Sequence, residues 1–384
     1  MLALALGLSA QAVTLGQTPQ QRAVLAVKNP TALSRPAEII EIPLAEIAAK
    51  IGPEAPERLT AEDLGSHKPL PVQVDGASLL VLVSLAPRQT LRIEIRQSAN
   101  PPAVSPLVFG RAVPERKDDF AWENDKVAHR VYGPALQATG EVTSGIDVWS
   151  KRVPDLVVNS WYLREAEGQR THNPALSYHK DTGQGMDSYD VGKTRGCGGT
   201  ALWKDGKLYV SRNYLTAEIL AAGPIRLRFR LRYAPWDADG AEATEEKTVT
   251  LDAGAHFNRI ESAVRLSNAS TARWAAGLAI HAGARVTSAP DGGSISVWEP
   301  LSDPATGMDG TAIVLPPGKS GTKAEAEGNV LLTMPLTSGA PVVYYAGSAW
   351  SRAEVPDEAA WSRFIEQFRE RLRHPLTTRW ERIE

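Results

Sequence analysis

The chain has 384 residues, with 42 Lys and Arg against 44 Asp and Glu, and a formal net charge of −2. This balance gives no general electrostatic attraction to nucleic acid or to an anionic membrane. The composition, 43% hydrophobic and 22% charged, is that of a globular protein and excludes disorder as the dominant state. The one cysteine, Cys197, excludes an intrachain disulfide and a cysteine-rich zinc site.

Residues 1–12 are expected to be the remnant of a secretory signal peptide. They form a short apolar run that ends in the small-x-small pattern Ala10-Gln11-Ala12. The alternative is a frayed apolar N-terminus. The run is too short to span a bilayer, and no later stretch predicts a membrane helix. We therefore expect a periplasmic or secreted protein without stable membrane insertion.

Period-two alternation of apolar residues, broken by turn residues, predicts a small β-sandwich over residues 20–98. A proline-rich linker is expected at 99–106, because proline removes ladder donors and stiffens the chain. The strands predicted within the sandwich are 23–27, 37–43, 70–74, 79–84 and 90–95, with a short helix at 44–51.

A larger β region is predicted over residues 107–352. Asp205-Gly206 is typical of a type I′ hairpin turn. Alternation places the arginines of 226–232 on one strand face. Two interpretations remain open for this row: a cationic cleft lining, or a solvated face paired with the acidic strand near Glu245 and Glu246.

The end of the chain, 356–380, differs from the rest and predicts an amphipathic helix that closes at His374-Pro375. The predicted fold class is therefore all-β with one C-terminal helix. The apolar stripe of the helix comprises Trp361, Phe364, Ile365, Phe368 and Leu372.

Candidate binding residues gather between 120 and 152. A single strand here would carry Glu123, Asp125 and His129 on one face. Such a row is either structural ion pairing or a sugar site whose carboxylates accept hydroxyl hydrogen bonds. Aromatic rings can stack on a pyranose, with sealing of the core as the alternative. The further binding candidates are Trp122, Arg130, Tyr132, Asp147, Trp149, Lys151 and Arg152.

The segment 178–199 contains six glycines, predicts an irregular loop and concentrates reactive side chains. It lacks the P-loop pattern, so a phosphate cradle is not expected. No motif here identifies a cofactor, and a divalent metal is the one addition that we consider. Cys197 is not favoured as a nucleophile, since only Arg195 lies near enough in sequence to lower its pKa. The candidates are His179, Tyr189, Lys193 and Arg195 for catalysis or binding, and His179, Asp181 and Asp187 for metal ligation.

Several motifs together resemble the domain-of-unknown-function family numbered 4861. They are F-A-W-E-N-D, Y-G-P, S-G-I-D-V-W-S-K-R-V, Y-H-K-D, G-M-D, V-G-K-T-R-G-C-G-G-T-A-L-W and L-D-A-G. The resemblance implies a galactose-mutarotase-like supersandwich of antiparallel strands. It also implies an exported bacterial protein of polysaccharide breakdown, acting on uronate glycans such as pectin, alginate or ulvan, with dehydratase activity in similar proteins. The chain departs from the family pattern at Thr182 and Gln184, where relatives often carry histidine and glutamate, and this departure leaves lost or altered activity open.

The chemistry implied is β-elimination, by a lyase or dehydratase. An enzyme must neutralise the uronate carboxylate, remove the C5 proton and protonate the leaving oxygen at C4, and each positioned proton transfer contributes roughly 10²–10⁴-fold. Our hypothesis makes His179 the base and Tyr189 or Tyr132 the acid, with Arg195 and Lys151 as the carboxylate clamp. His129 is a further candidate.

Two alternatives remain. A glycoside hydrolase would use a carboxylate pair drawn from Glu123, Asp125, Asp147 and Asp187. A non-catalytic carbohydrate-binding protein would use the same surfaces without turnover. In each case the expected partner is an acidic oligosaccharide and not nucleic acid.

Overall fold

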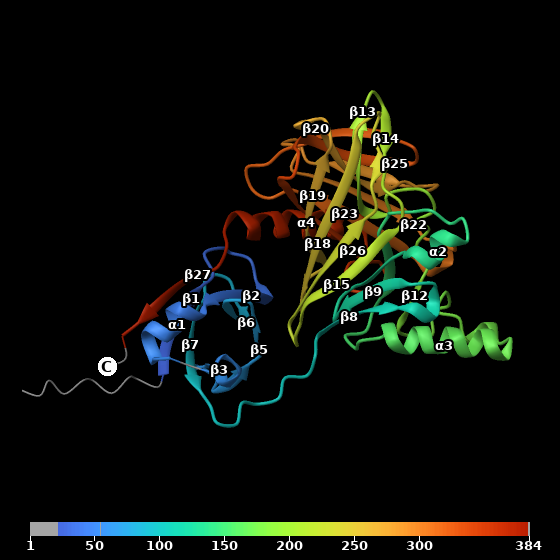
Figure 1. Cartoon of the computed structure of the whole chain (residues 1–384). Helices are drawn as coiled ribbons and strands as arrows, with labels where there is room; N and C mark the ends of the chain where they lie inside the picture. The colour runs from blue at the N-terminus through green and yellow to red at the C-terminus, as the bar shows by residue number, and fades with distance from the viewer. Residues whose placement is uncertain (1–21, 54, 383–384) are drawn as a thin grey trace, which may run out of the picture.

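The computed structural model describes residues 22–53 and 55–382. The expected signal-peptide remnant, residues 1–12, lies outside the described residues. Figure 1 shows a small unit in blue and a larger unit in green to orange, joined by an extended segment. Among the described helices, none has the length and apolar character needed to cross a membrane.

The small unit is a sandwich of two antiparallel sheets, with strand orders β27-β1-β7-β3-β4 and β2-β6-β5. The helix α1 (Leu44–Ile51) matches its predicted range. Four of the five strands predicted here are confirmed. The fifth, 70–74, is divided at Pro71 between β4 and β5 of different sheets, and β3 and β27 were not predicted. The strands are β1 (Arg22–Lys28), β2 (Arg35–Pro43), β3 (Leu59–Asp63), β4 (Lys68–Leu70), β5 (Val72–Asp75), β6 (Ser78–Leu85), β7 (Thr90–Gln97) and β27 (Thr377–Glu381).

The larger unit is built on two antiparallel sheets that enclose the main apolar core. A nine-stranded sheet has the order β15-β16-β18-β19-β26-β23-β22-β21, with β17 beside β18, and a five-stranded sheet has the order β14-β13-β20-β25-β24. The predicted all-β class is confirmed. The strands are β13 (Cys197–Lys204), β14 (Lys207–Tyr209), β15 (Tyr214–Ala222), β16 (Arg226–Tyr233), β17 (Trp236–Asp237), β18 (Glu242–Asp252), β19 (Phe257–Leu266), β20 (Thr271–Ala279), β21 (Arg285–Ser288), β22 (Ser294–Pro300), β23 (Met308–Val314), β24 (Thr322–Ala326), β25 (Asn329–Thr337) and β26 (Pro341–Trp350).

A third sheet, in the order β12-β11-β10-β9-β8, lies beside this sandwich. The helix α3 (Val158–Thr171) packs on it through Trp161 and Tyr162, and the sequence did not predict this helix. The short helix α2 (Pro134–Ala138) follows β10. The strands are β8 (Val108–Val113), β9 (Asp119–Asn124), β10 (Ala128–Val131), β11 (Asp147–Lys151) and β12 (Gly185–Asp187).

Two predictions in this region are wrong. The expected single strand through Glu123 and His129 is a hairpin, because the side chain of Asn124 accepts hydrogen bonds from the backbone N–H groups of Lys126 and Val127 and turns the chain. The glycine-rich segment 178–199 is not wholly irregular, since it contains β12 and the start of β13. The predicted Asp205-Gly206 hairpin between β13 and β14 is confirmed.

The two units dock through Gln73 and the β15–β16 turn. The Gln73 side chain accepts from the N–H groups of Ile225 (3.1 Å) and Arg226 (2.7 Å) and donates to the Arg226 carbonyl (2.9 Å). A Cβ on Gly223 would lie 2.0 Å from this side chain, so the turn needs glycine there. Side-chain hydrogen bonds to backbone therefore fix the turn against the small unit.

The arginine row of β16 is a paired face and not a cleft lining. Arg226 bonds Asp252 and Glu41, and Arg228 bonds Asp75 of the small unit. Arg230 and Arg232 each pair with Glu218 of β15 and with Glu246 of β18, the two strands that flank β16.

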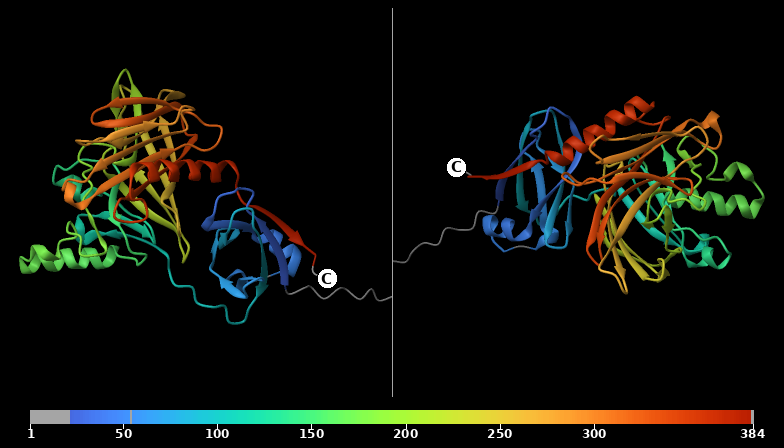
Figure 2. Two further views of the ribbon diagram at one scale, coloured as in Figure 1. Left: turned by 180° about the vertical axis from the view of Figure 1, so that it is seen from behind. Right: turned by 90° about the horizontal axis from the view of Figure 1, so that it is seen from above.

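The C-terminal segment links the two units. The helix α4 (Glu358–Arg373) begins at Asp357, whose side chain accepts from the Ala360 N–H, and packs its apolar stripe on the larger unit. It ends before Pro375, as the sequence indicated, and β27 follows in place of the helix expected up to residue 380. Figure 2 shows α4 running from the larger unit toward the small one.

Candidate functional site

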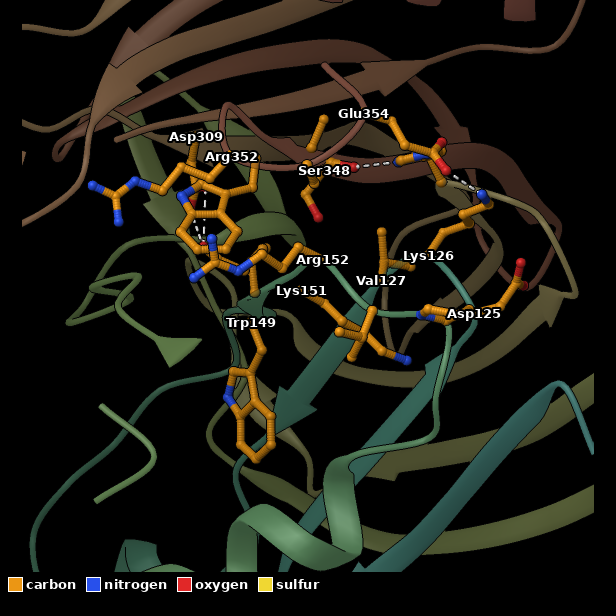
Figure 3. Close-up of a pocket in the computed structure, with 18 residues that line it drawn as sticks. Asp125, Lys126, Val127, Trp149, Lys151, Arg152, Asp309, Ser348, Arg352 and Glu354 are labelled. Atoms are coloured by element: carbon orange, nitrogen blue, oxygen red, sulfur yellow. Dashed lines mark hydrogen bonds and ion pairs between the residues drawn. The ribbon is translucent and has the colours of Figure 1, made fainter. Parts of the chain in front are cut away.

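A cavity of about 430 Å³ lies where β11, the β9–β10 turn and the segment after β26 meet (Figure 3). This volume is within the range of small-molecule sites, about 300–1,000 Å³. The lining comes from five separate stretches of chain, so only the folded protein forms it. These stretches are 125–127, 148–154, 256, 309 and 348–354.

Asp309 of β23 is the buried acid of the cavity. Only 1% of the residue is exposed, and Ser150 Oγ lies 3.1 Å from each carboxylate oxygen. Burial raises the pKa of Asp309 to about 8; Ser150 opposes the rise and Glu299 adds to it. The carboxyl group therefore holds a proton at neutral pH and can donate it.

Lys126 and Glu354 form one side of the cavity (Figure 3), and His256, another lining residue, contacts Glu354 there. Glu354 bonds Lys126 and lies 3.3 Å from Nε2 of His256, whose Nδ1 lies 3.1 Å from the Ser348 carbonyl oxygen. The hydrogen bond from His256 lowers the pKa of Glu354 to about 2, with Lys126 adding to the effect. Glu354 is thus a stable anion and a weak base.

Arg152 and Arg352 form the opposite side (Figure 3). Both contact Oδ2 of Asp181, Arg152 by a hydrogen bond and Arg352 with its Nη1 at 3.8 Å. The Arg152 guanidinium also lies over the ring of Trp350, 5.2 Å from its centroid. Trp350 is buried and supports Arg152, so its ring is not a free stacking surface.

The opposite face of β11 carries a second polar cluster, which we call the Arg130 group. Val148 and Ser150 face the sandwich, whereas Asp147 and Trp149 face the region of α3. Nη2 of Arg130 bonds both Asp147 Oδ2 (2.5 Å) and Asp187 Oδ2 (2.9 Å). The remaining members are Asp119 at 3.9 Å, Tyr178 at 3.2 Å and Tyr132 at 3.4 Å from the guanidinium.

Two acids of the Arg130 group, Asp147 and Asp119, have raised pKa values because they are buried. Burial raises the pKa of Asp147 to about 7, with Asp187 adding to the rise and Arg130 opposing it. Burial also raises the pKa of Asp119 to about 6. His179 lies at the rim, where its Nδ1 is 2.8 Å from the Asp187 carbonyl oxygen and its side chain is 57% exposed.

The structure thus gathers five predicted site residues, Arg130, Tyr132, Asp147, His179 and Asp187, in one cluster. His129 does not join them. It is buried against Trp122, accepts from Asn258 at Nε2 (3.0 Å), and burial lowers its pKa to about 4. His129 and Trp122 are therefore core residues.

The expected clamp of Arg195 and Lys151 is not formed. Arg195 is buried in the sandwich and bonds Ser144 Oγ at 2.8 Å; burial lowers its pKa to about 10. Tyr189 is also buried, and among the described residues its hydroxyl has no hydrogen-bond partner. Lys193 is exposed. Arg195, Tyr189 and Lys193 are all absent from the lining of the cavity.

Glu123 and Lys151 are a buried ion pair, 2.9 Å apart. Glu123 also accepts from the N–H groups of Val157 (2.8 Å) and Val158 (2.7 Å), so it anchors the start of α3. Three further binding candidates lie close by. Asp125, Trp149 and Arg152 all line the cavity, although the ring of Trp149 is buried and stacked on Trp161.

The three candidate metal ligands do not meet at one point, although Nδ1 of His179 lies 3.6 Å from Oδ2 of Asp187. Asp181 is paired with Arg152, and Asp187 with Arg130. Within 22–53 and 55–382, no three His, Cys, Asp or Glu side chains are grouped to hold a metal ion. Burial raises the pKa of Cys197 to about 12, so its thiol is not a ready nucleophile.

Sequence reasoning missed much of the cavity: Asp309, His256, Glu354 and Arg352 were not candidates. Asp309 and His256 sit in ordinary strand or loop patterns, and no local motif marks them. Only the pairing of β23 and β19 with β26 brings them together. Sequence spacing carries no signal for such a site.

Comparisons with known proteins agree with this architecture. A family model described as "Domain of unknown function (DUF4861)" matches residues 27–378. "Uncharacterized protein P7" of Formosa agariphila is 34% identical over 377 residues, covering 92% of each chain.

Two solved structures from Enterococcus faecalis align with this chain. A protein in the glycosyl hydrolase family 38 aligns with a TM-score of 0.51 and 8% identity, over 95% of this chain and 48% of that one. An alpha-mannosidase aligns at 0.46 and 8%, over 95% and 46%. The chain spans about half the length of both, and at this identity the first likeness shows a similar fold alone.

Proposed function

This chain belongs to the DUF4861 family, and we propose that it is a carbohydrate-active enzyme that cleaves uronate-containing oligosaccharides by β-elimination. The observation that carries the proposal is a buried acid, Asp309, that opens onto a cavity flanked by arginines. The relatedness in fold to a glycosyl hydrolase family 38 protein supports a carbohydrate substrate. The apolar run at residues 1–12 supports a site of action outside the cytoplasm.

The elimination assigns one step to each side of the cavity. Nδ1–H of His256 stays bonded to the Ser348 carbonyl, so Nε2 is the ring nitrogen that accepts the C5 proton, once the substrate has displaced it from Glu354 and the ring carries no proton there. The electron pair of that C–H bond forms the C4–C5 double bond. The C4–O bond breaks, and the leaving oxygen takes the proton of Asp309. The guanidinium groups of Arg152 and Arg352 stabilise the negative charge that builds up at the substrate carboxylate as C5 loses its proton.

Hydrolysis is the second candidate, and one observation favours it. Asp309 and Glu354 line the same cavity with pKa values of about 8 and about 2. Two carboxyl groups whose pKa values are driven apart suit an acid and an ionised partner across a glycosidic bond. A sugar-binding protein without turnover is the remaining alternative, in which the cavity binds oligosaccharide and releases it unchanged.

The test is a panel of uronic oligosaccharides, assayed for absorbance near 232 nm and for new reducing ends, with and without divalent metals. Elimination gives the absorbance, whereas hydrolysis gives reducing ends alone. Asp309→Asn keeps the shape of the side chain and removes its proton, so we expect turnover to fall roughly 10²–10⁴-fold.

Asp205→Asn is the matched control, because Asp205 is an exposed hairpin residue far from the cavity lining. It should keep wild-type turnover. Full activity in Asp309→Asn would contradict the assignment of the acid. Reducing ends without absorbance would replace elimination by hydrolysis.

A further inference from the structure

The mouth of the cavity holds two arginines and one carboxylate of the protein itself. The side chains of Arg152 and Arg352 are 30% and 41% exposed, so both reach solvent as well as the cavity. Among the described residues, Asp181 is the one acidic side chain within ion-pair distance of either. Two positive charges therefore share a single negative charge at this point.

Asp181 is placed there by its own loop. Its Oδ1 accepts from the N–H groups of Gly183 (2.9 Å) and Gly185 (3.2 Å), while its Oδ2 faces both arginines. The side chain is only 10% exposed. A carboxylate thus sits in front of two guanidinium groups at the edge of a cavity large enough for a sugar.

Arginine is suited to this arrangement because its planar N–H groups match the geometry of a carboxylate. Arg152 is further oriented by the ring of Trp350. Arg352 is held by a hydrogen bond to the Ala305 carbonyl, which occupies one of its nitrogens and leaves Nη1 directed at Asp181. Both guanidinium groups are therefore oriented before any ligand arrives.

We propose that Arg152 and Arg352 form the carboxylate subsite of the cavity, and that Asp181 occupies this subsite in the free protein as a stand-in for the ligand carboxylate. The inference deepens the proposed function and rests on it for the sugar. An incoming uronate must compete with Asp181, so the resting protein binds a single uronic acid weakly. Neutral sugars gain nothing from the subsite.

The experiment measures binding of D-glucuronate and of D-glucose by calorimetry to the full chain and three variants. Asp181→Asn keeps the Oδ1 contacts to the loop and removes the charge, and Asp181→Ala removes the whole carboxyl group. Each is expected to bind glucuronate about tenfold or more tightly than wild type. Without the Asp181 charge, the guanidinium groups of Arg152 and Arg352 are free to bind the carboxylate of the ligand. Affinity for glucose should not change.

Asp155→Ala is the matched control, since Asp155 is an exposed acid on the segment after β11 and forms no ion pair with any residue that the structure describes. It removes the same charge near the same cavity and should leave both affinities unchanged. Arg152→Gln combined with Asp181→Asn should remove the gain. Equal or weaker glucuronate binding in Asp181→Asn overturns the proposal and makes Asp181 a support for the arginines.

The binding experiment tests the carboxylate subsite separately from the proposed elimination. A gain in glucuronate binding without product from any oligosaccharide keeps the subsite and rejects the elimination. Product formation with no gain in either Asp181 variant keeps the enzyme and rejects the stand-in role.

Discussion

At the scale of single residues, Asp309 makes stability depend on pH. Its folded pKa of about 8 lies above the ordinary value for aspartate, about 3.9. Between these values the folded chain binds one more proton than the unfolded chain, so the free energy of unfolding decreases as the pH rises. The contribution of Asp309 is complete below about pH 4 and is lost as the pH approaches 8, with a slope of at most about 1.4 kcal/mol per pH unit.

Urea unfolding of wild type and Asp309→Asn from pH 5 to 8 tests this. The advantage of wild type over the variant should shrink steadily with rising pH, because the amide does not titrate. Parallel pH profiles for the two proteins would show that Asp309 is ionised in the fold, and would also remove it as a proton donor.

At the scale of elements, the position of α3 depends on Glu123 of β9. The Glu123 carboxylate accepts two N–H bonds at the start of the helix and pairs with Lys151. Glu123→Gln leaves the Lys151 charge buried without its counter-charge, so we expect a loss of about 3–5 kcal/mol in unfolding free energy. Hydrogen exchange in residues 158–163 should quicken first.

Glu141→Gln serves as the control, because Glu141 is exposed and lies 4.0 Å from Lys117. It should change stability by no more than about 0.5 kcal/mol. If Glu123→Gln costs no more than this control, the buried pair does not hold α3.

The same elements show what local sequence can predict. The helix α1 has an apolar face of Ile47 and Ile51 and follows Pro43, signals that lie within the helix and beside it. The start of α3 is anchored instead by Glu123, a residue of another strand, so its own segment carries no cap signal. For the site, the motifs predicted that Arg130, Asp147 and Asp187 matter, but could not predict a cavity assembled by strand pairing between distant segments.

At the scale of the molecule, the chain leaves the small unit by the segment 98–107 and returns to it through α4 and β27 (Figure 1). The small unit is therefore incomplete until the last strand is made. The alternation of apolar residues within 20–98 therefore could not predict the whole five-stranded sheet of the small unit. Its edge strand β27 pairs with β1 but comes from the far end of the sequence.

Removal of residues 377–384 should therefore weaken the small unit and spare the cavity. The deletion leaves β1 with β7 as its one partner, and it removes the bond from Trp380 Nε1 to Glu46 (3.1 Å) and the ion pair of Glu381 with Arg92 (2.7 Å). Each 1 kcal/mol lost lowers the Tm of a unit of 60–100 residues by about 4–8 °C, so we expect an early melting transition and rapid hydrogen exchange in β1.

Deletion of 382–384 alone keeps β27 and should leave the melting curve unchanged. Since the cavity is lined only by residues of the larger unit, glucuronate binding should persist in both deletions below the first transition. A single melting transition shifted as a whole, with loss of binding, would show instead that the two units fold as one.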